Sequence, residues 1–512
     1  MKKITILLLA ITFSTASYSQ TPLPNQLQEF LAAIDNCLLT NPVDGLCTNS
    51  QYGEMPDWDV SSVTDMQQAF ANKENFNADI SQWNVSNVSI MRNMFFGAHS
   101  FNQDITGWNT ANVSVMDQMF YEAYVFNQSI GTWDTSNVID MYYMFYEASA
   151  FDGDISSWNV SNVTNMASMF NGASSFNQPI GSWQTNSVAN MEKMFNSATS
   201  FNQSLNDWDT SSVTNMQAMF NNASVFNQSL NGWDTSNVVN MIKVFYEASA
   251  FDGDISNWDT SNVSDMRSLF RGASVFNGDI GSWDVSNVSI MRNMFFGAHS
   301  FNQQLNDWDT SNVTIMLDMF AGASAFNQSL NDWDTSNVTS MPGMFAEASA
   351  FNGDIGSWDV SSVTNMGSMF SLSGFSTNNY DAILNSWSQQ DVQSGVTLGA
   401  AGINYCNGAD ARQSLEDNNG WIITDAGLDC STASIDDQNQ LDISIYPNPT
   451  SDIVYIDGNY TQLKVIIYNV LGKEILNKSI TNSIDISHLD NGVYILQLSD
   501  GVKLITRKII KN

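Results

Sequence analysis

The 512-residue sequence has few basic residues, few histidines and almost no long apolar segments. Lysine and arginine total 17 against 52 aspartate and glutamate residues, which gives a formal charge of -35. Such a chain would repel phosphate backbones and anionic membrane surfaces, so we expect no nucleic acid among its partners. Hydrophobic residues still make up 43% of the sequence, which is enough for a substantial core.

Histidine is too scarce for most catalytic arrangements. It occurs only at His99, His299 and His488, and no Ser-His-Asp, Cys-His or HExxH arrangement is present. Secreted repeat proteins can cleave glycans with paired carboxylates, but the carboxylates here are too numerous and too alike to single out a pair. We therefore predict that the protein is not an enzyme, with a secreted glycan-active enzyme as the minor alternative.

The one marked apolar run lies at the N-terminus. Lys2 and Lys3 precede an apolar stretch over residues 4–13, and small residues follow near Ser17 and Ser19. This order is typical of a signal peptide, here residues 1–19, and the run is too short to span a membrane. No other segment approaches about 20 apolar residues, so we expect no transmembrane segment in the mature chain.

Four cysteines lie in two pairs near the ends of the central region. Cys37 and Cys47 are ten residues apart, and Cys406 and Cys430 are 24 apart. An even number in an exported chain favours two local disulfides within these pairs. Zinc is the alternative, but no histidine lies near either pair.

The central region repeats every 25 residues. Tryptophan recurs thirteen times, from Trp58 to Trp358, with Val five, Met eight and Phe twelve residues after each. One such unit cannot bury its own apolar side, so neighbouring units must stack. The pattern I/L-x-x-W-x-V/T-x-x-V fits a short parallel strand, and M-x-x-M-F-x-x-A has the spacing of a short helical turn. The sequence therefore predicts an α/β repeat solenoid over residues 58–375, with the Trp, Met and Phe columns in its core.

An acidic column follows the tryptophans directly. Carboxylates stacked about 5 Å apart repel each other by roughly 1 kcal/mol per neighbour even in water. Either each one caps a turn amide or is solvated, or the column forms a calcium-binding or cation-binding face. No other cofactor is expected. The column comprises Asp59 and Asp134, followed by Asp209, Asp234, Asp259, Asp284, Asp309, Asp334 and Asp359 in consecutive coils. A second column of asparagines, such as Asn87 and Asn112, is expected to hydrogen-bond backbone at a turn.

The flanking segments depart from the repeat. Residues 20–57 contain a helix-like apolar pattern over residues 27–38 and are predicted to cap the first coil, and residues 376–430 are predicted to cap the last. Residues 431–442 are polar and form a predicted linker. Residues 443–512 alternate apolar and polar residues in short runs, which predicts a small all-β sandwich domain.

The repeats resemble those of BspA-like leucine-rich repeat surface proteins, as in SNVTNMASMFNGA (residues 161–173) and FNQSLNDW (residues 326–333). The resemblance implies a right-handed, leucine-rich-repeat-like solenoid and a role in surface display, adhesion and protein binding. It assigns no binding residue to a particular position.

The C-terminal segment resembles the type A sorting domain of the type IX secretion system. YPNP (residues 446–449), YNVLG (468–472), LDNGVYILQL (489–498) and the basic end at Arg507, Lys508 and Lys511 carry the likeness. It implies that residues 443–512 engage the secretion machinery and that the protein is secreted or held on the outer face of the outer membrane.

These features favour a binding or adhesion scaffold for an unknown protein or glycan ligand, and a passive structural spacer is the alternative. Variation between coils separates the two hypotheses, because a binder needs particular residues whereas a spacer needs only length. Residues beyond the first Met column differ from coil to coil and include six of the chain's 17 basic residues, Arg92, Lys193, Lys243, Arg267, Arg271 and Arg292.

Overall fold

The computed structural model describes residues 22–48, 50–431, 443–458, 462–469, 472–499 and 504–512. The predicted signal peptide and all but the first residue of the predicted linker lie outside these residues. The chain divides into two compact units, described separately below: Met1–Asn404 with Gly408–Gly427, and Tyr405–Asn407 with Leu428–Asn512. None of the helices among the described residues is long and apolar enough to cross a membrane.

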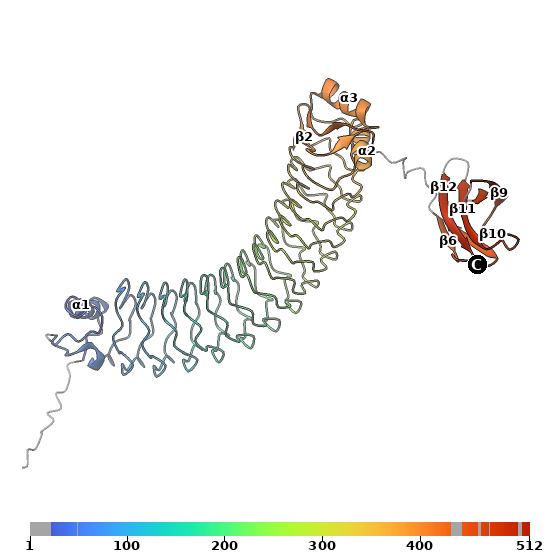
Figure 1. The fold of residues 1–512 in the computed structure, drawn as a ribbon. Helices are drawn as coiled ribbons and strands as arrows, with labels where there is room; N and C mark the ends of the chain where they lie inside the picture. The colour runs from blue at the N-terminus through green and yellow to red at the C-terminus, as the bar shows by residue number, and fades with distance from the viewer. Residues whose placement is uncertain (1–21, 49, 432–442, 459–461, 470–471, 500–503) are drawn as a thin grey trace, which may run out of the picture. The chain divides into compact units, whose positions relative to one another are not determined.

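The first unit is a curved stack of coils (Figure 1). Neighbouring coils pair in parallel through a bridge residue seven positions after the tryptophan, as Asp65 does with Ile90 and Ile90 with Val115. The coils of Lys243 and Arg267 are joined instead by backbone bonds such as Lys243 N to Arg267 O (3.2 Å). The bridges lead into the short strand β1 (Asn365–Met366), which pairs with β2 (Thr397–Gly399) of the C-terminal cap. The 25-residue spacing thus places equivalent residues of neighbouring coils beside each other.

The predicted helical turn is wrong. Residues 58–364, all of which are described, contain no helix and no strand longer than a bridge residue. The M-x-x-M-F segment is instead a run of turns in which alternate amides leave the coil: Met66 N donates to Ile90 O (2.9 Å), whereas Ala69 N donates to Met66 O (3.2 Å). A helix would use both amides internally, so the apolar spacing that suggests a helix is here the spacing of turns bonded to the next coil.

These turns require backbone that most residues avoid. The tenth and fourteenth residues after the tryptophan have positive φ, including Gln68 (60°), Asn72 (58°) and Glu122 (54°). A type II turn needs φ above zero at its third residue, and a non-glycine residue there costs roughly 1–2 kcal/mol. Gly97 and Gly172 occupy the same column without this cost. The other coils accept it because intercoil hydrogen bonds and packing hold the turns in place.

The core consists of continuous columns, as the sequence predicts. Trp108, Phe120 and Phe126 are at most 3% exposed, and the Phe120 ring stacks on Phe126 at 4.0 Å between ring centroids. The Trp108 indole also donates from Nε1 to Ile80 O of the preceding coil at 3.2 Å, and this bond recurs along the array. The invariant tryptophan therefore packs in the core of its own coil and also hydrogen-bonds to the preceding one.

Neighbouring coils lie closer together at one edge of the stack than at the other. Ring centroids are 4.4 Å apart for Phe96 and Tyr121, but 6.1 Å apart for Trp108 and Trp133. Figure 1 shows β2, which continues the bridge column, on the inner side of the bend. The residues just after the bridges therefore line the inner edge, and the bulky indoles lie toward the outer one.

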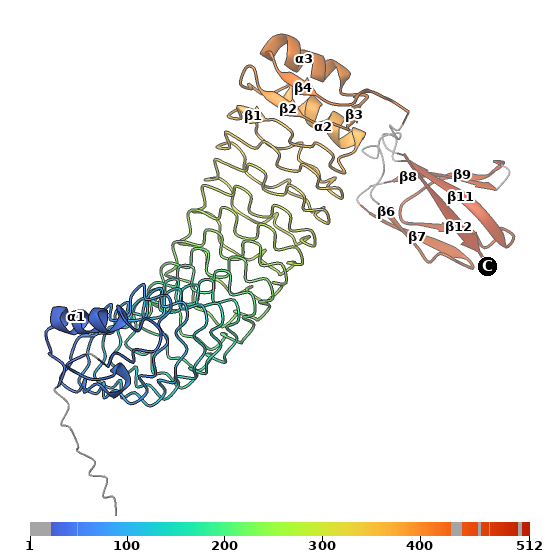
Figure 2. The same cartoon turned by 60° about the vertical axis from the view of Figure 1, so that its left-hand side comes forward.

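Each end of the stack carries a helix. At the N-terminal end, α1 (Leu27–Leu38) begins where the predicted helix begins, η1 (Met55–Asp57) follows, and Cys37 is bonded to Cys47. The second predicted disulfide, Cys406–Cys430, is also present, and both of its residues belong to the second unit. Figure 2 shows β1, β2 and β4 side by side at the C-terminal end of the stack. The remaining cap elements are α2 (Thr377–Trp387), β3 (Asn404–Tyr405), α3 (Ala409–Asn419), β4 (Ile422–Thr424) and β5 (Gly427–Leu428).

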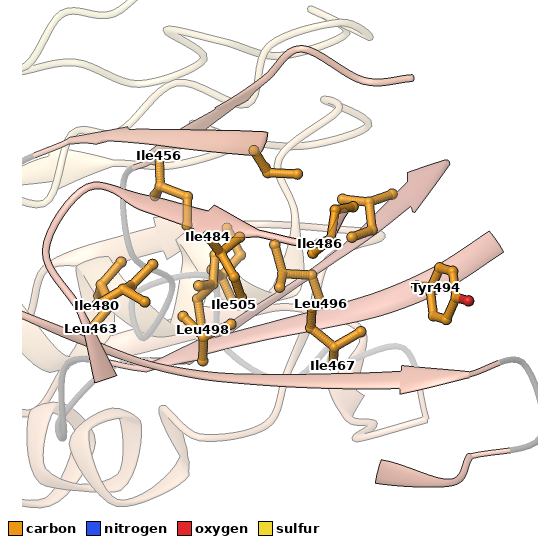
Figure 3. Packing of buried hydrophobic residues seen from close by; sticks show 13 residues of the cluster. Ile456, Leu463, Ile467, Ile480, Ile484, Ile486, Tyr494, Leu496, Leu498 and Ile505 are labelled. Atoms are coloured by element: carbon orange, nitrogen blue, oxygen red, sulfur yellow. The ribbon is translucent and has the colours of Figure 1, made fainter. Parts of the chain in front are cut away.

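The C-terminal domain has two antiparallel sheets, with strand orders β10-β7-β6 and β12-β11-β8-β9. Alternate residues of both sheets meet in one apolar core, which includes Ile456, Ile484, Leu496 and Ile505 (Figure 3). This arrangement agrees with the predicted sandwich. The strands are β6 (Ile443–Tyr446), β7 (Ile453–Gly458), β8 (Leu463–Asn469), β9 (Glu474–Ile480), β10 (Ser483–Asp485), β11 (Gly492–Ser499) and β12 (Leu504–Lys511).

Candidate ligand-binding face

The repeated polar residues are used to hold the stack together. In the asparagine column, Asn87 Nδ2 donates to Ser61 O of the preceding coil (2.8 Å), and Asn112 Nδ2 donates to Ser86 O (2.7 Å). Buried threonines act in the other direction, as when Thr235 Oγ1 donates to Asp259 O (2.9 Å). The expectation that the asparagines bond backbone is confirmed, and both columns join neighbouring coils.

The acidic column caps turns. Asp234 Oδ1 accepts hydrogen bonds from Ser236 N (3.0 Å) and Ser236 Oγ (2.6 Å), and these bonds lower the pKa of Asp234. Asn84 replaces aspartate in its coil and accepts the same bond from Ser86 N (3.2 Å), so the cap needs an oxygen but no charge. The same turn bond is made by Asp209, Asp259, Asp284, Asp309, Asp334 and Asp359.

The structure therefore gives no preformed group of metal ligands in support of the calcium hypothesis. Within the described residues, no three His, Cys, Asp or Glu side chains are grouped so that they could hold a metal ion. Calcium binding stays a prediction, which calorimetry with and without calcium tests directly.

The residues that vary between coils gather at the inner edge. The clearest case is the residue thirteen positions after each tryptophan, which we call the surface column. It is aromatic in the second to fourth coils, asparagine in the next three, and aromatic or cationic in the three after those. In order these residues are Phe96, Tyr121 and Tyr146; Asn171, Asn196 and Asn221; and Tyr246, Arg271 and Phe296.

The first zone is a cluster of tyrosines. Tyr121 stacks on Tyr146 at 4.5 Å, and Tyr142 meets Tyr143 edge to face at 4.0 Å. Together with Phe96 they line a hollow of 370 Å³. Burial raises the pKa of Tyr121 and of Tyr142 to about 12, with neighbouring tyrosines adding to the shift, so both hydroxyls stay neutral at physiological pH. The zone can offer rings and neutral hydroxyls to a ligand.

The second zone is a ladder of side-chain amides. Asn196 Nδ2 donates to Asn171 Oδ1 (2.6 Å), and Asn221 Nδ2 donates to Asn196 Oδ1 (2.5 Å). These three amides bond to one another along the edge, and the ladder lies between the other two zones.

The third zone stacks cations on rings. Arg271 lies between two aromatic side chains, with its guanidinium carbon 4.2 Å from the Phe296 centroid and 5.7 Å from the Tyr246 centroid. Lys243 Nζ lies 5.2 Å from the Tyr246 centroid. Arg292 completes the zone, because both it and Arg271 act electrostatically on Asp318 of the next coil. We call Lys243, Tyr246, Arg271, Arg292 and Phe296 the cationic zone.

Of the six variable basic residues predicted as candidates, the structure brings Lys243, Arg271 and Arg292 together. The other three pair locally: Arg92 with Asp117 (2.8 Å), Lys193 with Glu192 (2.9 Å), and Arg267 with Asp265. Sequence reasoning missed the tyrosine zone, although reading the repeat down its columns would have revealed three aromatic residues in succession.

Comparison with known protein families gives two matches. Residues 45–152, 126–233, 223–329 and 291–398 each match the family described as Mycoplasma protein of unknown function, DUF285. Residues 444–512 match the family described as secretion system C-terminal sorting domain. A search of curated protein sequences gave no match. The second match implies export by the type IX secretion system to the cell surface or the extracellular space.

Proposed function

Because the chain belongs to the family described as Mycoplasma protein of unknown function, DUF285, and ends in a secretion sorting domain, we propose that it is an exported binding and adhesion scaffold. The array is a leucine-rich-repeat-like solenoid of the BspA-like kind, displayed on the outer face of the outer membrane or released from it. Its ligand is an extracellular protein or glycan, and it performs no catalysis.

The zoned surface column is the observation that carries this proposal. The Trp, Met and Phe columns stay constant, and the Asn column varies only to Ser, because every coil needs the same packing and intercoil hydrogen bonds. A spacer would have no reason to group aromatic, amide and cationic residues in separate blocks along one edge. Clustered aromatic and arginine side chains are the residues that dominate binding energy at protein surfaces.

A passive spacer is the second candidate, because parts of the array are exact copies. Residues 145–156 recur at 245–256, and residues 86–103 recur at 286–303. Repetition of this kind makes length easy to change, and length is what a spacer uses.

The test is a binding screen of the full chain against extracellular-matrix proteins and polysaccharides. Two variants separate the candidates: Tyr121→Ala with Tyr146→Ala, and a chain lacking residues 184–208, which removes one whole coil from the amide ladder. A scaffold should bind at least one member of the panel and keep binding when the coil is removed. Binding to no member of the panel would favour the spacer.

A further inference from the structure

We propose that the cationic zone is a binding site for an acidic polysaccharide, that is, a sugar polymer carrying carboxylate or sulfate groups. The inference rests on the proposed binding function and names its ligand class. It starts from the scarcity of positive charge, because the array contains only seven lysine and arginine residues, all at the inner edge: Lys73, Arg92, Lys193, Lys243, Arg267, Arg271 and Arg292.

Three of the seven have no anionic partner. Lys243, Arg271 and Arg292 make no ion pair within 4.0 Å and no side-chain hydrogen bond with any described residue, whereas the other four each pair with a carboxylate. The three lie in consecutive coils. In a chain with a charge of -35, leaving adjacent cations unpaired keeps them free for an external anion.

Arg271 is held ready for such a ligand. It is half-buried between the Tyr246 and Phe296 rings, and its Nε is buried without an acceptor. A guanidinium stacked on a ring keeps its outer N–H groups in one plane, which suits bidentate contact with a carboxylate or sulfate. Because the side chain is already ordered, binding costs less conformational entropy.

The spacing of the zone suits a linear polymer. Lys243, Arg271 and Arg292 come from three consecutive coils, so they offer cations at three successive levels of the stack. A single small anion would contact one of these cations, whereas a chain of charged sugars can contact all three.

A sugar polymer fits better than an acidic peptide because two carboxylates, Asp318 and Glu247, flank the zone. Ionised Asp and Glu side chains of a peptide can only accept hydrogen bonds, whereas sugar hydroxyls can also donate them to these carboxylates. The same two carboxylates would limit the charge density of the ligand that fits.

The test measures binding of the full chain to heparin, polygalacturonate, polyglutamate and neutral dextran at 0.15 M salt, where repulsion from distant carboxylates is screened beyond about 8 Å. We expect saturable binding to heparin or polygalacturonate. Lys243→Gln, Arg271→Gln and Arg292→Gln should each weaken it about tenfold, as expected for the loss of one charge-assisted contact.

Lys193→Gln is the matched control, because Lys193 occupies the same repeat position as Lys243 but already pairs with Glu192. It removes the same charge and should leave binding unchanged. Equal losses from Lys193→Gln and Lys243→Gln, or tighter binding of polyglutamate, would overturn the site. Binding of only dextran or a matrix protein would overturn it too while leaving the scaffold function intact, and binding of nothing would count against both.

Discussion

Residues 86–103 and 286–303 are identical in sequence but lie in different surroundings. Their cores agree closely: Phe95 stacks on Phe101 at 4.0 Å, and Phe295 stacks on Phe301 at 4.1 Å. Even the unpaired Oδ1 of Asn293 recurs in the first copy. The inward side of a coil is therefore determined by its own sequence.

The outward sides of the two copies differ. Arg92 donates from Nε to both oxygens of Asp117 (2.9 and 2.8 Å), whereas Arg292 has no partner because the following coil carries Leu317 at that position. His99 stacks on Tyr124 at 4.6 Å, but His299 Nδ1 lies 2.8 Å from Gly322 O. Surface chemistry thus depends on the next coil as much as on the coil itself.

The largest expected effect concerns the core, which the two copies share. Phe95→Ala and Phe295→Ala each empty a fully buried site in a stacked column. Each should lower the free energy of unfolding by about 3–5 kcal/mol, as measured by chemical denaturation. If only one of the two substitutions destabilised the protein, the cores of the copies would not be equivalent.

Replacing Arg92 and replacing Arg292 should have different effects on stability. Arg92→Gln removes the partner of Asp117, which is 5% exposed, and should cost about 1–3 kcal/mol because a buried carboxylate loses its donor. Arg292→Gln breaks no side-chain hydrogen bond and no ion pair within 4.0 Å among the described residues, and it should change stability by less than about 0.5 kcal/mol. Equal costs in denaturation experiments would contradict the difference in pairing.

Placing a carboxylate beside Arg292, as in the first copy, should make Arg292 pair as Arg92 does. Leu317→Asp places a carboxylate where Asp117 stands beside Arg92, and it should weaken heparin binding by roughly tenfold, the effect of one lost charge-assisted contact. Leu317→Asn is the control of similar size without charge and should preserve binding. If both variants bound alike, pairing of Arg292 would not be what controls the site.

The smallest effect concerns the turn caps of the following coils, Asn109 and Asp309. Hydrogen bonds from Ser311 lower the pKa of Asp309, so its contribution is present above the unfolded pKa near 3.9 and is lost as pH falls through the folded value. Because Asp309 is exposed, Asp309→Asn should cost no more than about 0.5 kcal/mol at pH 7. This difference in thermal stability should shrink as the pH falls below about 3.9, and a difference that grew on acidification would have the wrong sign.

Much of the fold could be predicted because every coil has the same requirements for packing and for hydrogen bonds to its neighbours. Thirteen equally spaced tryptophans indicate stacking, and the alternation after Ile443 indicates a sandwich. The turns could not be predicted in this way, since Met66 N bonds to an oxygen 24 residues away and local spacing carries no information about such a partner. Which of the candidate cations stay unpaired could not be predicted for a similar reason: Arg92 is paired and Arg292 is not because the next coil carries Asp117 in one case and Leu317 in the other.

The intercoil hydrogen bonds also bear on how such a chain can change over generations. Each coil bonds to its neighbours in a fixed 25-residue register, so gain or loss of a whole unit preserves the backbone bonds between coils, whereas an insertion of another length breaks several. Recombination between copies is therefore structurally mild. A transplanted coil keeps its interior and acquires new neighbours, so shuffling existing units can generate new surface combinations without any point mutation.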